Sequence, residues 1–264
     1  MDWRFHLLKR AGYSSYTEET SGKILEFIGT TGIGKTTLFN KTMSKLRSRW
    51  LFAYHLGFFK RKTLRSETDE ILMRVLKNRT EKIYSSTSFC PWHSLLDLKL
   101  SVRVMHETMT VAQSEFPKGF AFDEGLFRHF PAEIVQLGDE IPVELWKNRA
   151  FVYLQAQTPE TALSRLKSRK RTTAQIESQR VISDDQILLR ITNDQEMFRS
   201  IVDRALSFGC PVIVIDAENP HEDSIKKVLD FESSLSQSFK MQETMAQTLN
   251  SSPKIDEKKR QPIS

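Results

Sequence analysis

The chain carries ILEFIGTTGIGKTTLF at residues 24–39. The apolar residues 24–28 predict a buried strand, and the residues from about 35 to 49 predict a helix. Between them, residues 29–36 match the pattern G-x-x-x-x-G-K-[ST] at every fixed position. A strand, a glycine-containing loop and a helix in this order predict a site for a nucleoside triphosphate with Mg²⁺.

The side chains and backbone of this P-loop have distinct predicted roles. Its glycines allow backbone N–H groups to point at phosphate oxygens, and the start of the helix adds partial positive charge. Lys35 is expected to reach the β and γ phosphates, and the hydroxyl of Thr36 is a predicted Mg²⁺ ligand. ATP and Mg²⁺ are the predicted cofactors. The nucleotide-binding residues predicted from the loop are Gly29, Thr30, Thr31, Gly32, Ile33, Gly34, Lys35, Thr36 and Thr37.

Two carboxylates follow another short apolar strand, predicted at residues 120–123. Asp123 stands where P-loop proteins place the acid that holds the hydration shell of Mg²⁺, so it is a predicted metal and catalytic residue. Glu124 follows directly and is a candidate base that orients a hydroxyl group or a water molecule. An ordinary solvated acid at the end of a strand is the alternative for each.

A basic segment at residues 165–171 holds five cations in seven residues. Arg165 and Arg169 lie one helical turn apart, where like charges repel, so an anionic partner is expected. We predict a closing lid in which Arg165, Arg169 and Arg171 neutralise charge on the transferring phosphoryl group. A solvated basic helix end is the alternative. Nucleic-acid contact is not expected, because the segment contains no aromatic residues.

Strand and helix patterns alternate along the rest of the chain. Further strands are predicted at residues 50–56, 150–156 and 212–216, and helices at 159 onward and 184–208. This alternation predicts an α/β fold of the P-loop NTPase type: a three-layer sandwich with a five-stranded parallel sheet, helices on both faces and a lid. The loops after the parallel strands are then expected at one edge of the sheet.

The chain of 264 residues is long enough for one domain with a substantial core. We predict an N-terminal arm at 1–21, a kinase-like domain at 22–239 and a disordered tail at 240–264. Within the domain, the long helical stretch at 60–116 is the predicted acceptor-binding region and 160–183 the predicted lid.

Composition indicates which ligands and which cellular setting suit the protein. Lys and Arg number 39 against 33 Asp and Glu, and the isoelectric point of about 9.2 suits anionic ligands. The two cysteines lie far apart in sequence, which predicts a reduced, cytoplasmic setting and no Cys-based metal site. The six histidines show no metal-binding spacing, so a His-based metal site is not expected either. No apolar run approaches the roughly 20 residues of a membrane span. Whether the chain forms a homodimer is left open.

Three stretches resemble the P-loop nucleoside and nucleotide kinases, the thymidylate kinase and deoxynucleoside kinase group. They are EFIGTTGIGKTTLF at 26–39, VYLQAQTPETALSRLKSRKR at 152–171 and CPVIVIDAENPHEDSIKKVLDF at 210–231. The second is similar to the family's P-E-x-x-x-x-R-x-x-x-R-x-R lid. The third implies that the loop after the last strand packs on adenine, with Ala217 and Asn219 as nucleotide-binding residues. The resemblance also implies a sheet in the order 2-3-1-4-5.

One departure keeps a second class open. After its third strand that family usually has Asp-Arg, whereas this chain has Asp123-Glu124-Gly125. The expected function is transfer of the ATP γ-phosphate to a small-molecule acceptor that the sequence does not identify, with a nucleoside or nucleotide among the candidates. The alternative is a P-loop ATPase that uses Asp123 and Glu124 for hydrolysis in a regulatory or motor role.

Overall fold

The computed structural model describes residues 23–47, 49–52, 67–85, 91–112, 119–168 and 183–251. They contain a five-stranded sheet in the order β2-β3-β1-β4-β5, in which all paired strands run parallel. This is the predicted fold class and the strand order implied by the resemblance. The strands are β1 (Ile24–Ile28), β2 (Trp50–Phe52), β3 (Gly119–Phe122), β4 (Arg149–Gln155) and β5 (Val212–Asp216).

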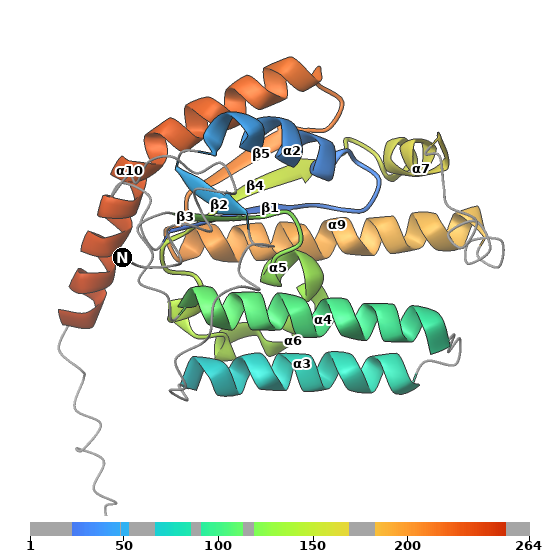
Figure 1. Cartoon of the computed structure of the whole chain (residues 1–264), viewed down its shortest axis with the longest axis horizontal. Coiled ribbons are helices and arrows are strands. Elements are labelled where there is room, and N and C mark those ends of the chain that lie inside the picture. Colours follow the sequence, from blue (N-terminus) through green and yellow to red (C-terminus); the bar gives the residue numbers. More distant parts are fainter. Residues whose placement is uncertain are drawn as a thin grey trace, which may run out of the picture.

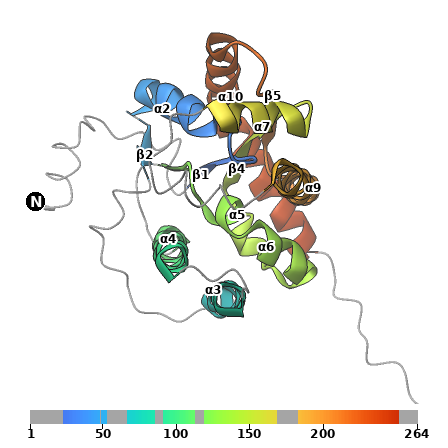
Figure 2. The same cartoon turned by 90° about the vertical axis from the view of Figure 1, so that its right-hand side faces the viewer.

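Helices cover both faces of the sheet (Figure 1). On one face lie α2 (Lys35–Leu46) and α10 (His221–Ser251), and α7 (Pro159–Ser168) lies at the end of the sheet nearest the P-loop. The other face carries α5 (Leu126–His129), α6 (Pro131–Leu137) and α9 (Asp184–Ser207). Seen end on, α3 (Glu67–Ser85) and α4 (Pro91–Ala112) form a further layer outside α5 and α6 (Figure 2). Two short 3-10 turns, η3 (Gly138–Glu140) and η4 (Val143–Leu145), lead into β4.

The side chains of successive residues in β1 pack on opposite faces of the sheet, because side chains alternate along a strand. Phe27 packs edge-on against Phe39 of α2, with ring centroids 5.1 Å apart. On the other side, Ile28 belongs to a cluster in which Phe127 of α5 meets Phe151 of β4 at 5.2 Å. Two apolar layers therefore hold β1 rigidly on both sides, which is what a loop emerging from its end requires.

The predicted helical region is a pair of long helices, α3 and α4, packed against each other. β2 covers the first three residues of the predicted second strand, and residues 53–56 of that prediction lie outside the described part. The helix after the P-loop ends at Leu46 instead of residue 49. The predicted N-terminal arm, and the lid from residue 169 to 182, also lie outside the described residues.

The predicted disordered tail differs from the structure, in which α10 continues past residue 240 to Ser251. Residues 240–247 are mostly good helix formers, Lys, Met, Gln, Glu and Ala. A helix that is already nucleated by packed residues extends at little cost, so a polar sequence without an apolar face can continue it. None of the helices in the described ranges is long and apolar enough to cross a membrane.

Candidate active site

The loop between β1 and α2 has a backbone shape that depends on glycine. Gly34 precedes the first turn of α2 with a φ of 94°, in the left-handed region. Gly29 has a φ of 138°, and a Cβ atom there would lie 2.5 Å from the carbonyl oxygen of Leu154. The first N–H groups of α2 have no partners within the helix, so the loop and the helix start form a cradle for an anion.

Lys35, the first residue of α2, joins this cradle to the end of β3. Its Nζ donates to the backbone oxygen and to Oδ1 of Asp123, both at 3.0 Å, and to Oε1 of Glu124 at 3.4 Å. The lysine side chain is only 5% exposed. The parallel register brings the ends of β1 and β3 together, so residues 88 positions apart in sequence form one charged group.

Glu124 is held as a carboxylate. Burial alone would raise its pKa, but the positive charges of Lys35 and Arg128 outweigh burial and hold the pKa below its ordinary value. The side chain is therefore ionised at neutral pH, which is the state that a proton acceptor needs.

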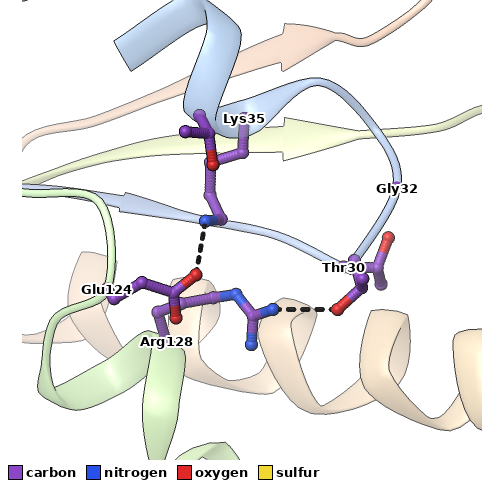
Figure 3. A pocket seen from close by; sticks show the side chains of 7 residues that line it. Thr30, Gly32, Lys35, Glu124 and Arg128 are labelled. Carbon is purple, nitrogen blue, oxygen red and sulfur yellow. Dashed lines mark hydrogen bonds and ion pairs between the residues drawn. The ribbon is translucent and has the colours of Figure 1, made fainter. Parts of the chain in front are cut away.

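Arg128 of α5 is a pocket residue that the sequence reasoning missed. Its guanidinium donates to the hydroxyl of Thr31 at 3.0 Å. In Figure 3, Arg128 extends from beside Glu124 toward the P-loop near Thr30. One pocket of about 100 Å³ lies between these groups. Its lining consists of Thr30, Thr31, Gly32, Lys35, Thr36, Glu124 and Arg128.

The pocket has the chemistry that a phosphate group requires. Two cations face it, and within the described residues the buried Oγ1 of Thr30 and Nε of Arg128 have no hydrogen-bond partner. Phosphate oxygens can satisfy both groups. The described residues hold no cluster of three or more His, Cys, Asp or Glu suited to a metal. Mg²⁺ does not need one, because it keeps several waters and takes ligands from phosphates.

The predicted site residues do not all lie at the pocket. Thr36 lines the pocket, whereas Thr37 is exposed and does not. Arg165 donates to the carbonyl oxygens of Ile33 at 3.2 Å and Ala217 at 2.7 Å, which ties the P-loop to the loop after β5. Asn219 lies in that same loop, where its N–H donates to Asp216. The lid residues Arg169 and Arg171 lie outside the described residues.

His129 lies behind the pocket and does not line it. The ring is 8% exposed, and its Nε2 lies 2.9 Å from Oγ of Ser101 and 3.7 Å from Oδ1 of Asp97. Burial and the positive charge of Arg79 lower the pKa of His129 to about 4, although Asp97 acts in the opposite direction. The imidazole is therefore neutral at pH 7 and serves as a packed hydrogen-bonding group.

The residues that sequence reasoning missed had weak signals of their own. Arg128 lies four residues after Glu124, a spacing that places two side chains on one side of a helical turn. Glu26, whose buried carboxylate bonds to Arg149 and to the backbone N–H of Arg128, is an acid within an otherwise apolar strand, which indicates a buried partner. Neither signal says which loop or strand the side chain meets, because that depends on contacts between distant segments.

The sheet order, the glycine cradle and the lysine at the start of α2 define a P-loop fold. No protein-family model matches the chain, and no curated protein matches its sequence. In structure it is similar to deoxyadenosine kinase from M. mycoides with bound dCTP, at 17% identity and a TM-score of 0.44, over 80% of this chain and 99% of that one. The structure of the same enzyme with bound dATP is similar at 16% identity and a TM-score of 0.45, over 80% of this chain and 100% of that one.

A gluconokinase from Sinorhizobium meliloti 1021 is also similar, at 13% identity and a TM-score of 0.41, over 84% of this chain and 98% of that one.

Proposed function

We propose that this protein is a P-loop phosphotransferase that moves the γ-phosphate of ATP to the hydroxyl group of a small acceptor. One observation carries the proposal. Lys35, Glu124 and Arg128 line one pocket at the P-loop, and Asp123 bonds to the same lysine at 3.0 Å, an arrangement that suits a triphosphate and an attacking hydroxyl. Positioning and charge stabilisation are the main protein contributions to phosphoryl transfer.

Each pocket residue has a place in this reaction. The P-loop N–H groups and Lys35 bind the phosphates, and Arg128 adds a second positive charge where the transferring group becomes more charged. Glu124 accepts the proton of the acceptor hydroxyl as the new O–P bond forms and the bond to the ADP oxygen breaks. Thr36 and Asp123 would hold Mg²⁺, which neutralises phosphate charge when it is bound.

Arg165, Ala217 and Asn219 belong to the nucleotide end of the proposed site. Arg165 bonds to the carbonyl oxygens of Ile33 and Ala217, so it links the phosphate loop to the loop proposed to contact adenine. Arg169 and Arg171 remain proposed lid residues. The acceptor is proposed to bind between the P-loop and the α3–α4 pair, with a nucleoside or nucleotide among the candidates.

A second function, ATP hydrolysis, draws support from Glu124. Its lowered pKa keeps a carboxylate ionised within 3.4 Å of Lys35, and such a group can orient a water as well as an acceptor hydroxyl. The two functions differ only in what occupies the space beside Glu124.

The discriminating experiment follows the label from [γ-³²P]ATP in the presence of nucleosides, nucleotides and sugars. The kinase predicts label on one acceptor class and a rate at least about tenfold above that with ATP alone, because a bound acceptor supplies the correctly placed nucleophile. Label found only in inorganic phosphate, at a rate no acceptor changes, supports the ATPase. Lys35→Ala should stop either reaction, whereas Lys45→Ala, an exposed lysine in the last turn of α2, should not.

A further inference from the structure

An acidic residue, Glu26, lies in the middle of β1, the central strand of the sheet. Its side chain is fully buried, with 0% exposure. A buried ion pair is often no more stabilising than apolar residues of the same size, because both charges lose their water. The adjacent residues of β1 are apolar and pack well, so stability of the sheet alone does not account for an acid at this position.

The carboxylate of Glu26 connects two parts of the molecule. Oε2 accepts a hydrogen bond from Nη1 of Arg149 in β4 at 2.5 Å, and the Arg149 side chain is 3% exposed. Oε1 accepts the backbone N–H of Arg128 at 3.0 Å, within the first turn of α5. Glu26 therefore acts as the cap of α5, whose own N-cap residue, Gly125, supplies no side chain.

The surroundings of the Glu26 carboxylate and of Arg149 are tightly packed. A Cβ atom on Gly125 would lie 2.5 Å from Cδ and 2.6 Å from Oε1 of Glu26. The guanidinium of Arg149 lies 4.9 Å from the centre of the Phe127 ring and donates through Nε to the carbonyl oxygen of Leu145 at 3.0 Å. The chain between Glu124 and Arg128 is thus held against the carboxylate with no room for a larger residue at its start.

We propose that Glu26, paired with Arg149, is a positioning residue that fixes α5 so that Arg128 faces the P-loop in the phosphate pocket. Arg128 is the link between the two sites: its backbone N–H bonds to Glu26, and its guanidinium bonds to Thr31. Glu124 lies one residue before the glycine that contacts Glu26, so the same contact sets its position. The inference rests on the proposed function in taking Arg128 to stabilise the transferring phosphoryl group.

The decisive variant is the double substitution Glu26→Met with Arg149→Met. It removes both charges together, so no unpaired charge stays buried, and it removes the acceptor for the first turn of α5. We expect a folded protein with Mg·ATP affinity within about threefold of the parent and kcat lowered on the order of tenfold or more, since the lost interaction acts in the transition state. Glu232→Gln is the matched control: that carboxylate is 1% exposed and bonded to Arg49 and Trp50, near the start of β2.

A double-mutant cycle separates positioning from simple support of the fold. If Glu26 acts through Arg128, the Met pair should lower kcat little further in an Arg128→Ala background. If the combined variant instead loses kcat by the full product of the two separate fold-losses, the proposal is overturned. A folded Met variant with the parental kcat would also overturn it. If the Met pair does not fold, the experiment uses Glu26→Gln in its place. The amide of Gln keeps one acceptor oxygen but loses the charge. An unchanged kcat in that folded variant would also overturn the proposal.

A second measurement does not depend on turnover. In protein labelled with ¹⁵N-arginine, the Nε–Hε resonance of Arg128, assigned by its absence in Arg128→Ala, should move in the Glu26 variants and stay in place in Glu232→Gln. An unmoved resonance would contradict the positioning role. A parent protein that turns over no ATP with any acceptor would remove the proposed function, and the resonance would still decide whether Glu26 places Arg128.

Discussion

His129 should make the folded protein progressively less stable as the pH falls below 6.5. The ring is buried beside Ser101 and Asp97, and burial together with Arg79 lowers its pKa from the ordinary value of 6.5 to about 4. Between these two values the unfolded chain binds a proton that the folded chain does not. The stability contributed by neutral His129 is therefore fully present above pH 6.5 and is lost as the pH falls toward 4.

The expected size of the effect follows from the pKa. Each pKa unit corresponds to about 1.4 kcal/mol, so a lowering from 6.5 to about 4 amounts to about 3 kcal/mol of stability lost across this range. A small domain has only about 5–15 kcal/mol in total, so the loss is large enough to measure by urea unfolding.

The measurement compares the parent with His129→Gln at pH 7 and pH 4.5. Glutamine does not titrate and can still exchange a hydrogen bond with Ser101, so the difference between the two proteins isolates the histidine from the carboxylates that titrate nearby. The variant should lose about 2–3 kcal/mol less than the parent over this interval. His106→Gln, at an exposed position of α4, should follow the parent curve. Parallel curves for the parent and His129→Gln would refute the reasoning.

Three further substitutions test the phosphate pocket and its support. Lys35→Ala should lower ATP-dependent turnover by about a hundredfold or more while circular dichroism shows the parental fold, because one preorganised charge is lost; near-parental turnover would exclude a phosphate-binding role. Asp123→Asn should shift the Mg²⁺ dependence of turnover more than it weakens ATP binding; superimposable magnesium titrations would count against this. Gly125→Ala should lower the free energy of unfolding by about 1–3 kcal/mol, because the new methyl group overlaps the Glu26 carboxylate. An unchanged urea midpoint would contradict that contact.

The sequence by itself determined the parts of this protein that depend on local pattern. The strand and the P-loop at residues 24–36, the carboxylates after β3 and the strand order implied by the resemblance all agree with the structure. These features are readable because strand periodicity, glycine backbone freedom and helix starts are properties of a few adjacent residues. The parallel arrangement then required the strand ends, and hence Lys35 and Asp123, to meet at one edge.

Only the tertiary structure decided which side chains complete the pocket. Arg128 meets Thr31 across 97 positions, and Glu26 reaches Arg149 across 123. Such pairings arise from how β1, β4 and α5 pack, and no local pattern encodes the distance between them. The same holds for α10, which continues to Ser251 although its sequence beyond residue 240 shows no apolar face. A helix that is nucleated on the packed domain can extend into residues that would not begin one alone.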